Sequence, residues 1–163
     1  MTAPRRPQLS LTQQAHNALR AHARASRRCE YGGVLVGYRT QNGLHIEDAL
    51  LVPDHTAART HYLRRGRDAT TVLAEYLDLQ SDPVIGYVGE WHTHPAPAPP
   101  SAIDHAAMRL MSSKNKRPVA LVVAALELNH RDIQLYAMLS TPSSLPRRLL
   151  GRYHDVLLDV ASL

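Results

Sequence analysis

The sequence predicts a single α/β (α+β) domain in which helices flank a mixed β-sheet. The length of 163 residues is close to the commonest size for one domain. Apolar patterns with helical spacing alternate along the chain with short runs typical of strands. Two pairs of these runs are joined by tight turns, which favours hairpins and argues against a doubly wound parallel sheet. No repeat or linker divides the chain, so we expect one domain over residues 1–163 with a loose N-terminus at 1–9.

The N-terminal half is expected to begin with an amphipathic helix. Apolar residues from Leu11 onwards recur at four-residue steps, and Ser10 or Thr12 can cap the start of this helix. Asn42-Gly43 is a strong hairpin signal between two apolar runs. The pattern therefore predicts a helix at 9–26, strands at 31–39 and 44–52, and a second helix at 67–80.

The C-terminal half repeats this mixture of strands and helices. The polar stretch 129–132, with the sequence NHRD, separates two apolar runs and indicates a second hairpin. The last twenty residues have an amphipathic pattern with Gly151 as a weak point. We expect a strand at 83–91, a helix at 101–113, strands at 117–128 and 133–139, and a final helix at 144–163.

Composition favours a cytoplasmic protein. The longest strongly apolar run, 118–128, is too short to span a bilayer, and residues 1–10 lack the apolar stretch of a secretory signal. The single cysteine, Cys29, cannot form an internal disulfide, which suits a reducing compartment. The formal charge of +5 indicates either a solvated basic surface or an electronegative partner. No basic run is interleaved with aromatic residues, so nucleic acid and membrane are not expected partners.

The stretch 89–104, GEWHTHPAPAPPSAID, carries the most chemistry in the chain. In a strand, His92 and His94 point to the same face. Asp104 stands where a helix should begin and can return its carboxylate towards the strand end. Two imidazoles and one carboxylate leave a fourth position open, as in catalytic zinc sites, and imidazole suits zinc better than magnesium.

A structural interpretation of the same stretch remains open at this point. Ser101-x-x-Asp104 also fits a capping box, which needs no metal. On this interpretation, the segment 96–100, APAPP, is just a rigid connector, since proline restricts it to extended geometry. An isolated His-x-His pair is usually two surface or half-buried histidines.

Together with an upstream segment, this stretch resembles the JAMM (MPN-plus) metalloproteases, and most closely their compact prokaryotic JAB branch. The family motif is an upstream Glu, then His-Ser/Thr-His-Pro, then Ser-x-x-Asp. The sequence carries EYGGVLVGY at 30–38 and then HTHP and SAID in the expected order. The resemblance covers roughly residues 10–140 and implies a JAB/MPN fold, which is related to that of cytidine deaminases. One departure is the loop between His94 and Asp104, which has nine residues where the family usually has ten.

The resemblance implies a role for each matching residue. His92, His94 and Asp104 would hold Zn²⁺, which lowers the pKa of a water molecule and polarises the scissile carbonyl. Glu30 would act as general base and then as acid, and Ser101 would donate a hydrogen bond to the oxyanion.

Three further residues near the motif need an assignment. Glu90 lies two residues before His92 and is a rival for the base, although the family match favours Glu30. Strand alternation predicts that Cys29 is a core residue, turned away from Glu30. Trp91 is expected on the core side of its strand.

The resemblance implies an isopeptidase or peptidase that cuts after the C-terminal tail of a ubiquitin-like modifier, in deconjugation or precursor maturation. Compact prokaryotic members are often encoded beside E1-like and E2-like proteins in antiphage operons, so such proteins are expected partners in a bacterial pathway. A peptidase acting on sulfur-carrier proteins is an alternative that would use the same residues. A non-catalytic MPN scaffold typically lacks the ligands, and a nucleic-acid-associated protein is suggested only by the charge.

Overall fold

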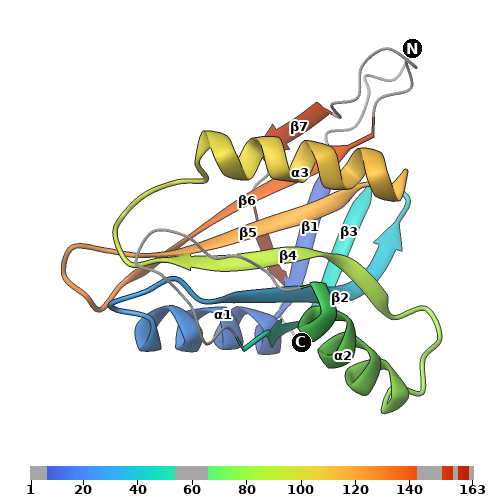
Figure 1. Ribbon diagram of the computed structural model, residues 1–163, viewed down its shortest axis with the longest axis horizontal. Helices are drawn as coiled ribbons and strands as arrows, with labels where there is room; N and C mark the ends of the chain where they lie inside the picture. Colours follow the sequence, from blue (N-terminus) through green and yellow to red (C-terminus); the bar gives the residue numbers. More distant parts are fainter. Residues whose placement is uncertain (1–6, 54–65, 143–151, 156–157, 162–163) are drawn as a thin grey trace.

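The computed structural model describes residues 7–53, 66–142, 152–155 and 158–161. These residues form one eight-stranded mixed sheet, in the order β7-β6-β5-β4-β2-β3-β1-β8, and three helices (Figure 1). This confirms the predicted α/β domain with a mixed sheet. The strands are β1 (Gln8–Thr12), β2 (Gly32–Thr40), β3 (Gly43–Leu51), β4 (Gly86–His94), β5 (Val119–Leu126), β6 (Ile133–Thr141), β7 (Arg152–Asp155) and β8 (Leu158–Ala161), and the helices are α1 (Gln13–Ala25), α2 (Gly66–Asp78) and α3 (Ala102–Asn115).

The central strand β4 makes the sheet mixed. It pairs antiparallel with β2 on one side and parallel with β5 on the other. Both predicted hairpins are present, because β2 pairs antiparallel with β3 and β5 with β6. The chain passes from β4 to its parallel neighbour β5 through α3, as a parallel connection requires. The carboxyl end of β4 therefore lies close to the beginning of α3.

The N-terminal helix is shorter than predicted. Residues from Gln8 to Thr12 form strand β1, which pairs in parallel with β3, and the helix begins only after Thr12. Thr12 caps it by accepting a hydrogen bond from the Ala15 amide at 3.1 Å. Leu9 and Leu11 alternate with polar residues, which is the strand period, whereas Leu11 also fits the four-residue series of the helix. The strand also begins inside the segment 1–9 that was expected to be loose.

The prediction of a C-terminal helix at 144–163 is wrong for the part of this segment that the structure describes. Arg152–Asp155 and Leu158–Ala161 are strands, and the other residues of 144–163 lie outside the described part of the chain. β7 pairs antiparallel with β6, and β8 pairs in parallel with β1. Both short strands satisfy backbone groups at the two edges of the sheet, so long-range pairing overrides the local helical pattern.

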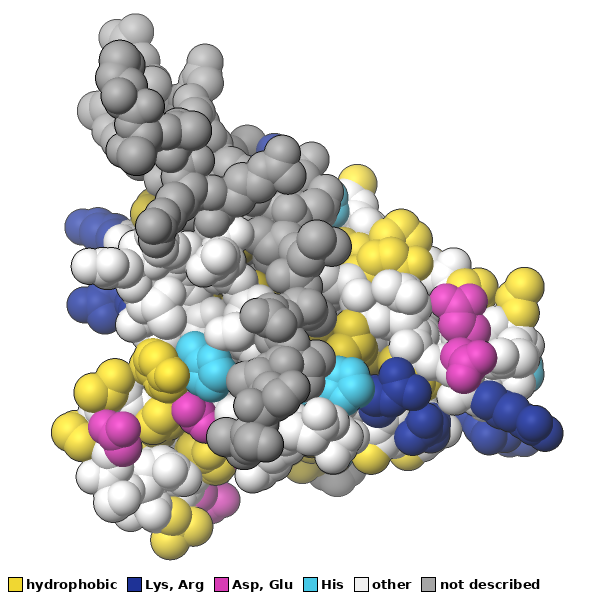
Figure 2. Space-filling view, turned by 180° about the vertical axis from the view of Figure 1, so that it is seen from behind, with side chains coloured by type: hydrophobic (Ala, Val, Ile, Leu, Met, Phe, Trp, Pro, Cys, Tyr) yellow, Lys and Arg dark blue, Asp and Glu magenta, His cyan; other side chains and the backbone are white. Residues whose placement is uncertain are grey.

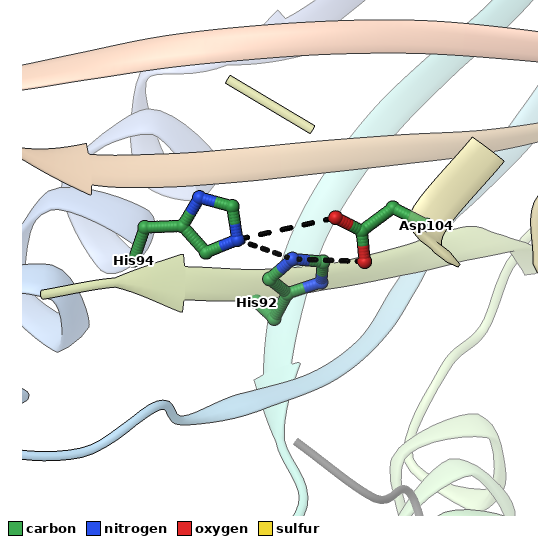
Figure 3. A group of neighbouring side chains, drawn as sticks. All are labelled: His92, His94 and Asp104. Atoms are coloured by element: carbon green, nitrogen blue, oxygen red, sulfur yellow. Dashed lines mark hydrogen bonds and ion pairs between the residues drawn. The ribbon is translucent and has the colours of Figure 1, made fainter. Parts of the chain in front are cut away.

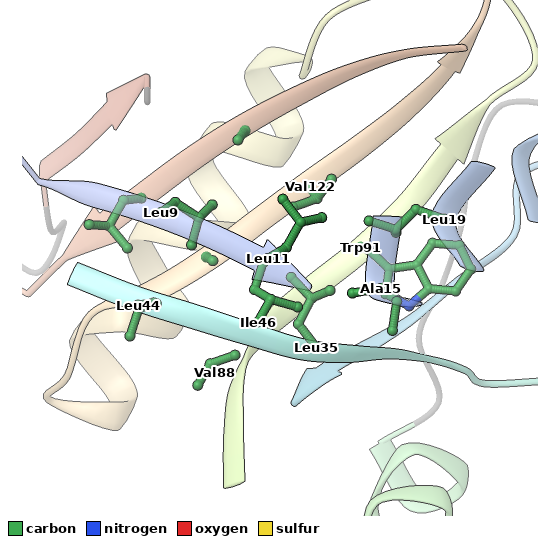
Figure 4. Packing of buried hydrophobic residues seen from close by; sticks show 14 residues of the cluster. Leu9, Leu11, Ala15, Leu19, Leu35, Leu44, Ile46, Val88, Trp91 and Val122 are labelled. Carbon is green, nitrogen blue, oxygen red and sulfur yellow. The ribbon is translucent and has the colours of Figure 1, made fainter. Parts of the chain in front are cut away.

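Each face of the sheet has its own core. The larger core packs α1 against one face and includes Trp91, which is fully buried as predicted (Figure 4). The indole N–H of Trp91 donates to the Leu50 carbonyl oxygen at 3.0 Å, and the ring stacks on His22. On the other face, α3 packs Met108 against β5 and β6. Because residues next to each other in a strand face opposite sides, Trp91 on the α1 side leaves His92 on the α3 side.

The surface of the described residues shows no continuous basic area on the face drawn in Figure 2. Dark blue Lys and Arg side chains stand in separate groups, and acidic side chains lie beside one of them (Figure 2). Among the described residues, no helix is both long and apolar enough to cross a bilayer.

Candidate metal centre

The carboxyl end of β4 fixes the two histidines of the motif. His92 lies opposite Gly32 of β2, and His94 lies opposite Ala125 of β5. Strands on both sides therefore hold this part of the backbone. The two imidazoles point to the α3 side and are only 8% and 9% exposed. Their positions are thus set by the sheet rather than by a loop.

The first turn of α3 supplies the carboxylate. Ser101 is the N-cap residue, and its hydroxyl oxygen accepts a hydrogen bond from the Asp104 amide at 3.2 Å. In return, the Ser101 amide and hydroxyl both donate to Asp104 Oδ2, at 2.6 and 2.7 Å. The capping box that the sequence indicated is present, and it aims the Asp104 carboxylate at the two histidines.

His92, His94 and Asp104 form a group that can hold a metal ion (Figure 3). The two Nε2 atoms lie 3.1 Å apart, and Asp104 oxygens lie 3.5 Å from His92 Nε2 and 4.0 Å from His94 Nε2. Ligands on a tetrahedral zinc ion at about 2.0–2.1 Å are about 3.3–3.4 Å from each other. The spacing and the N₂O donor set therefore fit a zinc-type site with three protein ligands. The nine-residue loop is long enough for the ligands to converge.

The nine-residue loop also orients one of the candidate ligands. His94 Nδ1 lies 2.8 Å from the carbonyl oxygen of Ala98. Because a carbonyl can only accept, Nδ1 carries the proton and Nε2 presents its lone pair to the metal group. Ala98 contributes through its backbone, so no sequence signal pointed to it.

The surroundings of Asp104 favour its ionised form. Burial opposes the ionisation of Asp104, but interaction with the neighbouring His92 and hydrogen bonds from Ser101 outweigh it. Together they hold the pKa of this carboxyl well below its usual range. Asp104 is therefore ionised at neutral pH, which is the form that binds a cation.

Glu30 immediately precedes Tyr31, which is hydrogen-bonded to β4 between the two histidines. Three hydrogen bonds join Tyr31 to Thr93. The Thr93 amide donates to the Tyr31 carbonyl at 2.8 Å, the Tyr31 amide donates to Thr93 Oγ1 at 2.9 Å, and the Thr93 hydroxyl donates to the Tyr31 carbonyl at 3.4 Å. These bonds continue the β2–β4 register, in which Gly32 lies opposite His92. Glu30 lies just before β2 and is only 8% exposed. Thr93, quoted in the motif without a role, thus fastens the segment that carries Glu30.

Glu90 and Cys29 are the two other residues near the motif for which the sequence suggested a role or a place. Glu90 accepts a hydrogen bond from the Tyr87 hydroxyl at 3.3 Å and is not a member of the metal group. Cys29 is half-buried and lies in a bend three residues before β2, so the prediction that it belongs to the core is wrong. The alternation argument did not apply to Cys29, because strand geometry begins only at Gly32.

Comparisons with known proteins agree with this geometry. The family model described as prokaryotic homologs of the JAB domain matches residues 12–138. A curated Pseudomonas aeruginosa protein named CD-NTase/cGAS isopeptidase is 37% identical over 112 residues, which cover 64% of this chain and 68% of that protein. The solution structure of a Desulfitobacterium hafniense protein superposes with a TM-score of 0.65 at 20% identity and covers 94% of each chain. This last similarity concerns the fold alone.

Proposed function

The chain belongs to the family of prokaryotic homologs of the JAB domain, and from this premise we propose that it is a zinc-dependent isopeptidase that releases a ubiquitin-like modifier from its conjugates. The isopeptidase name of the Pseudomonas relative supports hydrolysis of an isopeptide bond. The observation that carries the proposal is the convergence of His92, His94 and Asp104 on one small volume. A bound zinc ion would supply an activated water at neutral pH and would polarise the scissile carbonyl.

Glu30 is the proposed proton carrier. Two observations support this role: Glu30 immediately precedes Tyr31, which is hydrogen-bonded to Thr93 between the two histidines, and Glu30 itself is buried. It would take the proton of the attacking water and deliver it to the leaving amine of the target lysine. Glu90, the rival base, is instead engaged with Tyr87.

Ser101 is the proposed hydrogen-bond donor to the oxyanion. For this role its hydroxyl group must first give up a hydrogen bond that it makes in the structure. Its hydroxyl proton points at Asp104 Oδ2. To stabilise an oxyanion on the substrate, the hydroxyl must rotate away from Asp104, whose Oδ2 would keep the bond from the Ser101 amide. Ser101 therefore both positions a ligand and can contact the substrate.

The substrate class is proposed from the family and from the relative. The modifier would enter by its C-terminal tail in a bacterial conjugation pathway with E1-like and E2-like partners, of the antiphage type. The name of the Pseudomonas protein adds a CD-NTase as a second candidate for the protein whose C-terminal tail is cut.

The test uses the purified chain loaded with zinc. Three reporter fusions are offered, in which a fluorescent protein follows the C-terminus of ubiquitin, of a bacterial CD-NTase or of a bacterial sulfur-carrier protein. We expect cleavage of the ubiquitin or the CD-NTase fusion, a loss of about 10³-fold in kcat for Glu30→Gln with zinc content unchanged, and loss of both zinc and activity for Asp104→Asn. Cleavage of the sulfur-carrier fusion alone would favour that alternative. Full activity in Glu30→Gln would make the mechanism wrong.

A further inference from the structure

Helix α3 exposes an apolar stripe that its own fold does not use. Ile103 is 70% exposed and Leu110 is 61% exposed, and Ala106 and Ala107 between them are also exposed. These positions follow the spacing i, i+3, i+4 and i+7, so they share one face of the helix. The opposite face packs Met108 into the core. The stripe is therefore a second apolar face on a helix that has already buried one.

The stripe begins at the metal group. Ile103 directly precedes Asp104, whose carboxylate lies 3.5 Å from His92 Nε2. Leu110 lies about 10 Å further along the helix. A peptide bond held at His92, His94 and Asp104 must therefore lie next to the first residue of the stripe. A globular domain just upstream of that bond can reach the rest.

We propose that this stripe is the docking surface for the folded domain whose C-terminal tail is cleaved, and this inference rests on the proposed function. Targets of an isopeptidase vary, whereas the domain that carries the tail is constant. A fixed surface can match only the constant partner. Lys114, four residues beyond Leu110, is exposed at the end of the stripe, and Lys116 and Arg117 follow it. The partner surface is thus apolar with an acidic residue at its border.

The size of the stripe fits a transient contact better than a dimer of this chain. Four side chains on one helix offer much less than the roughly 800 Å² per partner that a stable interface buries. An enzyme must release its product, so a small docking surface suits it. The cost of losing such a contact should appear in substrate capture rather than in the chemical step.

The experiment compares a folded substrate with its own tail. One substrate is the ubiquitin or CD-NTase fusion that the wild-type chain cleaves, and the other is a peptide of its last ten residues carrying the same reporter. For Leu110→Asp we expect kcat/KM on the fusion to fall by about five- to tenfold through KM, with the peptide unaffected. Lys114→Glu should lower kcat/KM on the fusion in a salt-dependent way. Leu79→Asp, at an 85% exposed leucine just beyond α2, is the matched control and should behave as wild type.

Each other outcome decides against the docking surface. Equal losses on fusion and peptide would show damage to the site, and no loss on either would show that the stripe is not used. If Leu110→Asp has a lower molecular mass in solution than the wild type and its cleavage is unchanged, the stripe binds a second copy of this chain. Leu110→Ser, with circular dichroism and zinc content checked, guards against misfolding. If the zinc-loaded wild type cleaves neither fusion, the proposed function itself fails, which is distinct from cleavage that ignores Leu110.

Discussion

Ser101 shows how closely residue-level contacts in this protein combine structural and chemical tasks. It caps α3 by accepting from the Asp104 amide, and it donates twice to the Asp104 carboxylate. The same residue is the proposed oxyanion donor. If the proposed roles hold, one serine supports the helix, positions a candidate metal ligand and takes part in the reaction, so a substitution should affect all three.

Ser101→Ala is expected to weaken metal binding as well as catalysis. It removes the hydroxyl bond that holds Asp104, so the affinity for zinc should fall by about tenfold. The loss of the cap should lower the free energy of unfolding by about 1 kcal/mol. Zinc titration and urea unfolding measure the two effects, and Ser101→Thr, which keeps a hydroxyl, should restore most of both. A fall in kcat with unchanged zinc affinity would mean that Ser101 acts on the substrate alone.

From the surroundings of His22 we expect the free energy of unfolding to depend on pH. It is half-buried against Trp91, and burial lowers its pKa, while Asp48 raises it by a smaller amount. Between the lowered pKa of the folded chain and the ordinary histidine pKa of 6.5, the unfolded chain binds this proton and the folded chain does not. Stability contributed by neutral His22 is therefore complete above pH 6.5 and is lost as the pH falls below it.

The change His22→Phe keeps an aromatic ring on Trp91 and removes the proton. In EDTA, the free energy of unfolding of the wild type should decrease from pH 7.5 to pH 5.5 more steeply than that of His22→Phe. Urea unfolding at several pH values measures this difference. Parallel pH curves for the two proteins would contradict the assignment. The ionisation of Asp104 does not interfere, since its lowered pKa keeps it charged throughout this range.

At the level of elements, the sequence correctly predicted the helices and strands whose apolar residues fit either the helix period or the strand period, but not both. Strands β2, β3, β4, β5 and β6 and helices α2 and α3 appear where they were expected. Leu11 fits both the strand period and the helix period, and the sequence alone could not decide between them. The strands at 152–155 and 158–161 exist because β6 and β1 offer edges to pair with. Such pairing partners lie too far away along the chain for local patterns to reveal them.

Gly33 in β2 gives a prediction at the same scale. A Cβ at this position would collide with the carbonyl oxygen of Leu50, which accepts the hydrogen bond of the Trp91 indole. Gly33→Ala should therefore lower the free energy of unfolding by about 2–3 kcal/mol. Gly86→Ala is the matched control, because a Cβ there meets nothing within 4 Å, and it should be close to neutral. Urea unfolding of both variants tests this, and equal stabilities would contradict the close approach of β2 and β3.

Considering the molecule as a whole, the candidate site could be located from sequence, but its support could not. Residue types, spacing and the family resemblance together were enough to propose His92, His94 and Asp104, which the fold does bring together. The carbonyl of Ala98 that orients His94, and the bond from Tyr31 to Thr93 beside Glu30, depend on backbone placement. Backbone groups are the same at every residue, so their roles appear only when the fold is known.

Metal binding should stabilise the whole domain, because the ligands come from two different elements. His92 and His94 belong to β4 and Asp104 to α3, and a shared ion would join the sheet to the helix that covers it. Zinc at 100 times its dissociation constant should raise the free energy of unfolding by about 2.7 kcal/mol. EDTA should reverse this gain, and magnesium, which prefers oxygen ligands, should not produce it.

Asp104→Asn should lose most of the gain, whereas Glu30→Gln should keep it, because Glu30 is proposed to move protons rather than to bind zinc. Urea unfolding with and without each metal measures these differences, and a gain that persists in Asp104→Asn would place the zinc elsewhere.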